Sequence, residues 1–189
     1  MARKAQNKID ENTKIEFPDS YRVVAADLSL RRPGLCVLNV RKTEQDTKVK
    51  VKKLISVDNK SAKKKSHGQL LEEIRDTFMR ELFPVKPDTY FVRETGIMHQ
   101  GTPAERNLSK VEGLMDWIVW RMAGKEWYSI YPVTVKKLVA GSGKAEKEEV
   151  AAALSKYVGE QNYKCDDESD SVAVGIAWLI QQRELEEIP

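Results

Sequence analysis

The chain has 189 residues, of which 41% are hydrophobic and 32% charged, and this composition predicts a single globular α/β domain. No apolar run reaches the roughly 20 residues that span a bilayer, and the N-terminus lacks the apolar core of a signal peptide, so we expect a soluble protein of the cytoplasm. The net charge of +3 is only mildly basic, and Cys36 and Cys165 have neither zinc-site nor disulfide spacing, which predicts two free thiols.

The first half of the chain predicts an arm, three strands, a helix and a fourth strand. Residues 1–20 are polar and are expected to form a flexible N-terminal arm before one folded domain over residues 21–189. Two short apolar runs at hairpin distance predict antiparallel strands, and a run with alternating basic residues predicts a third. The next helix and strand are expected to form a β-α-β crossover. These elements are expected over residues 21–27, 35–40, 48–57, 69–83 and 89–94.

The second half of the chain predicts one more strand surrounded by helices. A broad apolar face predicts a long helix, and a strand, a short helix, a glycine turn and two further helices follow it. These elements are expected over residues 103–122, 126–132, 133–138, 145–157 and about 167–185. The order of elements is that of the ribonuclease H-like fold, a mixed five-stranded sheet flanked by helices, although a nucleotide-binding α/β domain shares much of it.

Four carboxylates occupy positions where a sheet opens to solvent or a helix begins. Asp27 and Glu94 each end an apolar strand. Asp167 and Asp170 lie one helical turn apart at the start of the last helix. Each has a plainer explanation, because Asp27 can be a turn residue, Glu94 an ordinary surface residue, and Asp166 or Asp167 a helix cap. Capping does not explain Asp170, which lies inside an apolar stretch.

Together, the four carboxylates predict a site for divalent cations. Carboxylates that converge within a few ångströms repel one another unless a hard cation compensates their charge. Mg²⁺ suits such oxygen donors, with Mn²⁺ as a substitute. Two such ions about 4 Å apart can hold a phosphodiester, activate a water molecule and stabilise the leaving 3′-oxygen. The sequence therefore predicts metal-dependent phosphodiester hydrolysis.

With these residues in view, the chain resembles the RuvC-type Holliday junction resolvases of the ribonuclease H-like superfamily. The run YPVTVKKLVAGSGKAEKEEV is similar to the segment that precedes the last catalytic acids of the family, and DDESDSVAVGIAW resembles the closing D-x-x-D helix. With Asp27 and Glu94, the likeness spans about residues 20–180. It implies a structure-selective endonuclease that resolves Holliday junctions with paired symmetric nicks, as a phage or divergent member of the family.

The resemblance also implies roles for individual residues. Lys136 and Lys147 fall where the family has lysines near the cleaved phosphate, and Lys147 is expected to take part in catalysis. Ordinary solvation of a helix surface is the plainer explanation for both. Lys137 and Lys144 are weaker candidates for contacts with the DNA backbone. The metal-binding tetrad, expected to hold two Mg²⁺ ions, consists of Asp27, Glu94, Asp167 and Asp170.

The chain departs from the family pattern at two places that would face DNA. Where the bacterial pattern turns through Pro-Gly after the first Asp, this chain continues to Arg31 and Arg32, so its hairpin is expected to meet DNA differently. Where relatives commonly carry an aromatic wedge, it has Ile97 and Met98, and an apolar side chain can still insert into an opened junction. His99 is expected to contact DNA or lie in the loop, because the tetrad already supplies enough oxygen donors.

The symmetry of the expected substrate predicts a homodimer. A four-way junction has two-fold symmetry, so symmetric incisions require two active sites related by a two-fold axis. In the family, the helix that matches residues 103–122 helps to form the dimer, and here it carries Trp117 and Trp120, although plain core packing also explains its apolar face. Basic clusters such as Lys60–His67 would add salt-dependent affinity for branched DNA. We expect no membrane contact, and the sequence does not identify a branch-migration motor.

Two other functions fit the same residues. A different ribonuclease H-like nuclease would act on RNA or on an RNA/DNA hybrid, and it would need contacts to the 2′-hydroxyl. A non-catalytic junction-binding module would keep the fold without cutting, although the presence of all four acids counts against it.

Overall fold

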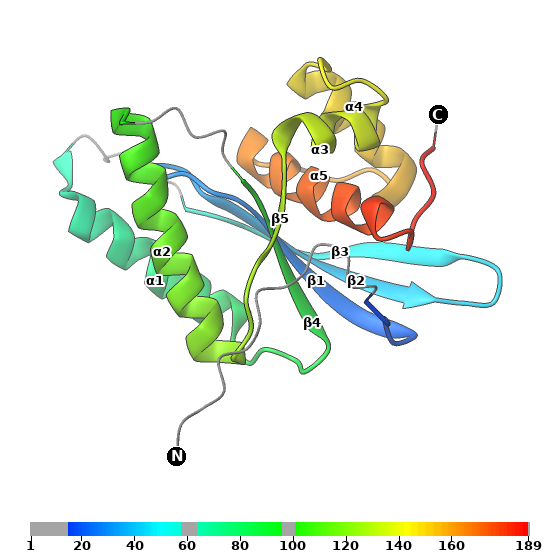
Figure 1. Ribbon diagram of the computed structural model, residues 1–189, viewed down its shortest axis with the longest axis horizontal. Coiled ribbons are helices and arrows are strands. Elements are labelled where there is room, and N and C mark those ends of the chain that lie inside the picture. Colours follow the sequence, from blue (N-terminus) through cyan, green and yellow to red (C-terminus); the bar gives the residue numbers. More distant parts are fainter. Residues whose placement is uncertain (1–14, 58–63, 96–100, 189) are drawn as a thin grey trace.

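A five-stranded mixed sheet runs through the centre of the molecule (Figure 1). The structure is a computed structural model that describes residues 15–57, 64–95 and 101–188. The sheet order is β3-β2-β1-β4-β5, and the sequence correctly predicts the number of its strands. The elements are β1 (Ser20–Asp27), β2 (Gly34–Lys42), β3 (Thr47–Ser56), α1 (His67–Leu82), β4 (Thr89–Glu94), α2 (Pro103–Ala123), β5 (Tyr128–Ile130), α3 (Pro132–Ala140), α4 (Lys147–Val158) and α5 (Asp166–Gln181).

Strand β1 lies at the centre of the sheet and pairs differently on its two sides. It is antiparallel to β2, as the hairpin spacing predicts, and parallel to β4. Helix α1 therefore carries the chain from the edge strand β3 across to β4, which pairs with β1 and not with β3. Because β1 and β4 are parallel neighbours, their carboxyl ends meet at one edge of the sheet, where ligands of such sheets bind.

Helices cover both faces of the sheet (Figure 1). α1 and α2 pack on one face, and α3, α4 and α5 pack on the other. α5 lies directly on the strands because Gly175 has no side chain. A Cβ atom there would lie 2.6 Å from Leu38 Cδ1 and 3.1 Å from the Cβ atom of Ala25. This close approach brings the N-terminus of α5 to the ends of the central strands.

Most elements begin and end within a few residues of their predicted bounds. β5 is shorter than the predicted strand over 126–132, since Pro132 already begins α3. α3 continues to Ala140, where Gly141 adopts a left-handed φ of 75° and ends the helix. α5 ends before the predicted residue 185, because Arg183 has a φ of 61° and the chain turns away from the helix.

Part of the predicted arm is packed on the core. Ile15 and Phe17 lie against the cluster under α5, and the ring centroid of Phe17 is 4.8 Å from those of Tyr21 and Tyr90. The folded domain therefore begins earlier than residue 21. The flexible arm remains a prediction for residues 1–14, which lie outside the described residues.

Two features of the whole chain complete the description. Cys36 is buried and Cys165 is half-buried, and both are free thiols, as their spacing predicts. Across residues 15–57, 64–95 and 101–188, no helix is both long and apolar enough to cross a membrane.

Candidate active site

Asp27 and Glu94 lie beside each other at the end of two neighbouring strands. The parallel register pairs Ala26 of β1 with Arg93 of β4, so the next residue on each strand is one of the two acids. Both side chains are half-buried at the edge of the sheet. The fold thus brings together two carboxylates that are far apart in the sequence.

Helix α5 brings Asp167 and Asp170 to the same edge. Cys165 is its N-cap residue and no side chain caps it, so neither acid that the sequence offers as a cap takes that role. A Cβ atom on Gly34, at the start of β2, would lie 2.0 Å from the carbonyl oxygen of Asp167. The backbone of α5 therefore touches the sheet at the site, and only glycine permits this contact. Sequence analysis did not single out Gly34.

Burial and repulsion between carboxylates raise the pKa values of Asp27, Glu94 and Asp167. Burial raises the pKa of Asp27 to about 6, and the charges of Asp170 and Asp167 add to the rise. Burial also raises the pKa of Glu94 to about 7, with further contributions from Asp27 and Asp170. The pKa of Asp167 is raised mainly by burial, and Asp170 adds to this shift. The four carboxylates are therefore close enough to act on one another.

Lys147 supplies positive charge to this cluster. From the first residue of α4, its ammonium donates a hydrogen bond of 2.6 Å to Asp170 Oδ2. This bond raises the pKa of Lys147. Its charge in turn opposes the raised pKa values of Asp27 and Glu94, and the charge of Lys136 on α3 also lowers the pKa of Glu94. The two lysines that the family resemblance places near the phosphate therefore lie beside the acids.

The other predicted DNA contacts are less closely tied to the cluster. Arg32 lies near enough to Asp167 to oppose the rise in its pKa. Arg31, Lys137 and Lys144 are exposed, and in the part of the chain that the structure describes they make no contact with the four acids. The predicted apolar wedge, Ile97 and Met98, and the neighbouring His99 lie outside the described residues.

The donor set suits a hard divalent cation. Within the described residues, no three side chains of the His, Cys, Asp and Glu types are arranged closely enough to hold a metal ion as they stand. The carboxylates nevertheless interact through their charges, and the raised pKa values mean that ionising them is unfavourable without a compensating positive charge. Carboxylate oxygens are the ligands that Mg²⁺ accepts. The residues present therefore fit the predicted ion.

Glu168 is a buried acid that sequence analysis did not single out. It is only 2% exposed, and it accepts hydrogen bonds from Ser56 Oγ at 3.0 Å and from the backbone N–H of Lys164 at 2.9 Å. These bonds tie the end of β3 to the start of α5. The acidic run DDESD does not reveal which of its members is fully buried, and Glu168 is recognised only through its hydrogen bond to Ser56 on β3.

Comparison with known proteins finds sequence and structural similarity to RuvC. No family model matches the chain. A curated protein, the crossover junction endodeoxyribonuclease RuvC of Methylobacterium radiotolerans, is 29% identical over 163 residues, which cover 82% of this chain and 71% of that protein. This chain is similar in sequence to RuvC over most of its length. The Thermus thermophilus RuvC structure matches with a TM-score of 0.72 and 19% identity, over 86% of this chain and 96% of that one.

The RuvC likeness extends to a DNA complex. The structure of T. thermophilus RuvC with a Holliday junction substrate matches with a TM-score of 0.70 and 18% identity, over 87% of this chain and 96% of that one. These matches confirm the resemblance to the RuvC-type resolvases and the ribonuclease H-like fold that the sequence predicts.

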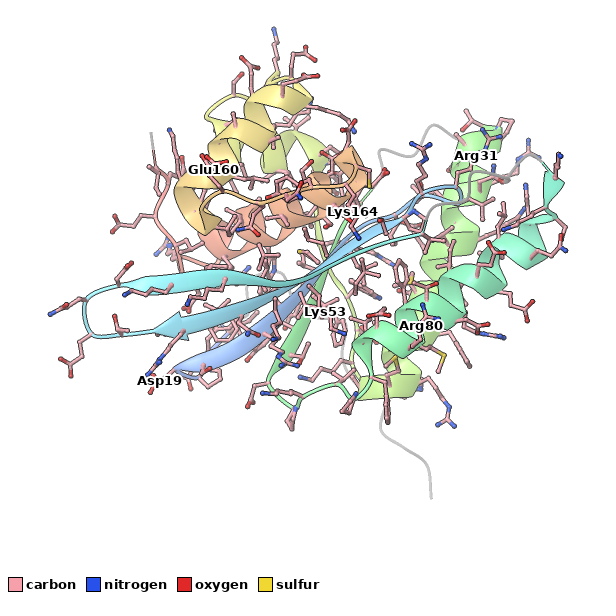
Figure 2. All side chains as sticks on the ribbon, turned by 180° about the vertical axis from the view of Figure 1, so that it is seen from behind. Asp19, Arg31, Lys53, Arg80, Glu160 and Lys164 are labelled. Atoms are coloured by element: carbon pink, nitrogen blue, oxygen red, sulfur yellow. The ribbon has the colours of Figure 1, made fainter. Side chains whose placement is uncertain are left out.

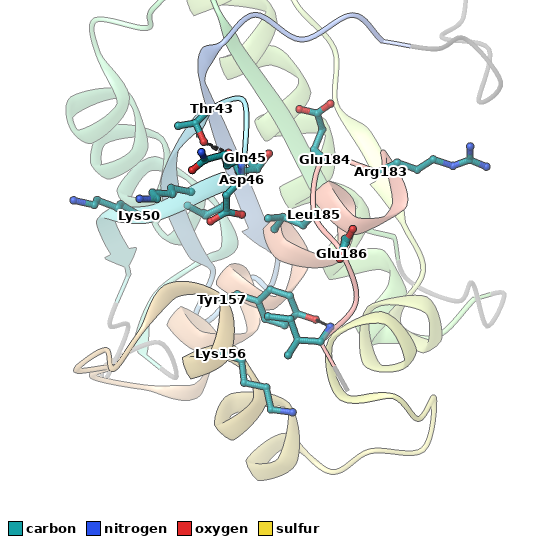
Figure 3. A pocket seen from close by; sticks show the side chains of 14 residues that line it. Thr43, Gln45, Asp46, Lys50, Lys156, Tyr157, Arg183, Glu184, Leu185 and Glu186 are labelled. Atoms are coloured by element: carbon teal, nitrogen blue, oxygen red, sulfur yellow. Dashed lines mark hydrogen bonds between the residues drawn. The ribbon is translucent and has the colours of Figure 1, made fainter.

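A large cavity lies away from the acids, at the opposite end of α5 (Figure 3). It has a volume of about 670 Å³ and lies between the β2–β3 hairpin, the end of α4 and the segment after α5. That segment is held by a 2.9 Å hydrogen bond from the backbone N–H of Ile188 to the Tyr157 hydroxyl. The walls carry both charges, from residues such as Lys156 and Glu186, and none of the predicted site residues lines it. The cavity is therefore separate from the candidate active site.

Proposed function

We propose that this chain is a Holliday junction resolvase, an endonuclease that cuts a four-way DNA junction with paired symmetric nicks. One observation carries the proposal, namely that four carboxylates meet at one end of a RuvC-like sheet, where their charges help to raise the pKa values of Asp27, Glu94 and Asp167. The name of the curated relative, a crossover junction endodeoxyribonuclease, and the solved RuvC complex with a Holliday junction support the same reaction and substrate.

We assign the metal site to Asp27, Glu94, Asp167 and Asp170, with two Mg²⁺ ions and Mn²⁺ as a substitute. Such cations supply the charge that activates water and stabilises the leaving 3′-oxygen in phosphodiester hydrolysis. The protein contributes the placement of the oxygen donors. Two of them stand on strand ends and two on the first turns of a buried helix, and rigid elements of this kind hold a constellation more accurately than loops do.

Lys147 has a second role in the proposed reaction. Its hydrogen bond fixes the carboxylate of Asp170, and its side chain is 58% exposed, so the ammonium can also reach a phosphate oxygen of the bound DNA. A cation at this position favours the charge that develops on the phosphate in the transition state. Lys136 contributes further positive charge on the side of Glu94.

We assign the DNA-binding surface to the basic residues around the acids. Their charges would neutralise phosphates and position the junction without reading its sequence. The apolar wedge and the loop histidine stay predictions, because their segment is not described. The proposed contacts are Arg31, Arg32, Lys136, Lys137, Lys144 and Lys147, together with Ile97, Met98 and His99.

The proposed enzyme acts as a homodimer with one nuclease domain in each subunit. Trp117 and Trp120 lie three residues apart on α2 and therefore share a face, and they are 48% and 49% exposed. Two large exposed aromatic side chains on one helix are typical of a surface that another protein covers. A two-fold dimer through α2 would present two sets of acids to the two-fold symmetric junction.

A cleavage assay on a labelled immobile four-way junction tests the proposal. We expect symmetric paired nicks in Mg²⁺ and none in EDTA, and none from Asp170→Asn, which should still bind the junction. The matched linear duplex should stay intact. Cleavage of an RNA/DNA hybrid in preference to the junction would instead support the RNA-directed nuclease, and metal-independent binding without any nick would support the non-catalytic module.

A further inference from the structure

A groove lies on the face of the sheet opposite α5, between the strands and the C-terminal end of α1. Its volume of about 300 Å³ is at the small end of ligand pockets. Val24 and Val37 form its floor on the sheet, and Val85 forms part of the opposite wall. Phe83 stands at its margin with 72% of its surface exposed. The groove is therefore apolar and open to solvent.

A buried hydroxyl group in this groove lacks a hydrogen-bond partner. Thr89, the first residue of β4, lines the groove and is only 2% exposed. Among the described residues, none forms a hydrogen bond with its Oγ1 atom. A buried polar group without a partner costs about 1–3 kcal/mol, so such groups are rare in folded proteins. A ligand that offers a polar backbone group at this depth would satisfy the hydroxyl.

The rim of the groove is basic. Four cationic side chains line it, whereas Glu81 is the one carboxylate that does so within the described residues. Glu81 is already engaged, because Lys53 Nζ lies 3.3 Å from its carboxylate at the end of α1; Figure 2 shows Lys53 on the sheet. Lys52 and Lys86 form no ion pair with any other described residue. The cationic side chains are Arg22, Lys52, Lys53 and Lys86.

The positive surface continues from the groove along the β2–β3 hairpin. Side chains alternate along a strand, so Arg41, Lys48 and Lys50 lie on the same face as Val37, and all three are exposed. The register places Arg41 directly opposite Lys48 and Lys50 opposite Asn39. Like charges in opposite positions destabilise a sheet. An anionic chain that passes over this row would remove that repulsion.

We propose that the groove binds a short acidic segment of a partner protein that inserts one apolar side chain. The floor would take the apolar anchor, the hydroxyl of Thr89 would bond to the peptide backbone, and the basic rim would bind the flanking Asp and Glu residues. A nucleic-acid backbone would leave the apolar floor uncovered, which is why a peptide fits the groove better. The groove lies toward the start of β1 and β4, away from the carboxylates, so the partner and the DNA can be bound together.

Fluorescence anisotropy with a defined peptide tests this inference on the full chain. The probe is a fluorescein-labelled decapeptide of Asp and Glu residues around one Phe, and its matched control carries Ser in place of Phe. We expect the control peptide to bind at least about tenfold more weakly, because the anchor supplies most of the affinity. The double variant Lys52→Glu/Lys86→Glu should bind the Phe peptide about tenfold or more weakly than the wild type does. Lys156→Glu on α4 reverses one charge away from the groove; this control should bind the Phe peptide like the wild type.

Two further measurements separate binding from folding and from catalysis. Thr89→Val keeps the shape of the side chain and removes the unpaired hydroxyl, so it should raise the Tm of the protein. It should also lower the affinity for the Phe peptide several-fold, because the peptide backbone loses its hydrogen-bond partner. The double lysine variant should cleave junctions at the wild-type rate whether or not the peptide binds. Equal affinity of the Phe and Ser peptides would overturn the proposal. The proposal would also be overturned if the double variant lost affinity for single-stranded or four-way DNA but kept its affinity for the peptide.

Discussion

Replacing Asp27 with asparagine is expected to abolish cleavage and to stabilise the fold. In the folded chain the pKa of Asp27 is raised from 3.8 to about 6 by burial and by neighbouring acids. Each pKa unit of difference from the unfolded chain is worth about 1.4 kcal/mol, so the ionised carboxyl costs about 1–3 kcal/mol once partial solvent exposure is allowed for. For a chain of this length, the substitution should raise the Tm by roughly 2–12 °C.

The direction of the pKa shift fixes how this gain depends on pH. Because the folded-state pKa of Asp27 lies above its unfolded value, folding favours the protonated carboxyl. The cost is absent below the unfolded value of 3.8, grows as the pH rises, and is complete above the folded value of about 6. The variant should therefore match the wild type near about pH 4 and exceed it most above about pH 7.

Thermal melts in EDTA at several pH values measure this difference. Asp19→Asn, at an exposed position just before β1, is the matched control and should leave the Tm unchanged at every pH. Added Mg²⁺ should raise the Tm of the wild type more than that of Asp27→Asn, because a cation that binds only the folded state stabilises it by mass action. If Asp27→Asn raised the Tm equally at low and high pH, or lowered it at high pH, ionised Asp27 would not destabilise the folded chain as argued.

Three other substitutions test the arrangement of the site and the assembly. Gly34→Ala would place a Cβ atom 2.0 Å from a backbone oxygen of α5, so we expect a loss of about 1–3 kcal/mol in thermal melts and a larger loss of junction cleavage. Gly113→Ala is the matched control, because a Cβ atom there meets nothing within 4 Å, and it should retain wild-type stability and junction cleavage. Lys147→Met should preserve junction binding, slow single-turnover cleavage by about 100-fold and move its pH profile upward, because the lysine charge lowers the pKa values of the neighbouring acids. Trp117→Ser with Trp120→Ser should give a folded monomer in light scattering; an unchanged dimer would contradict an interface through α2.

The sequence predicts the strand-end acids well because their positions depend on local patterns. An apolar run that stops at Asp27 or Glu94 indicates both the strand and the place where it meets solvent. The pairing of β4 with β1 does not follow from such a pattern, since it depends on contacts between residues far apart in the chain. Gly34 and Glu168 were missed for the same reason. The need for glycine in one case and for a buried carboxylate in the other exists only once α5 lies on the sheet.

The tight contact of α5 with the sheet explains how the fold tolerates four repelling carboxylates. Just beyond the acids, the same helix buries Ile176, Trp178 and Leu179 almost completely. Burying each large apolar side chain contributes about 1.5–3 kcal/mol, so one or two of them offset the cost of ionised Asp27. The close contacts at Gly34 and Gly175 leave the helix little room to move away from the strands. The acids therefore cannot relieve their repulsion by separating, so protonation of Glu94, whose pKa is about 7, or a bound divalent cation would lower their energy.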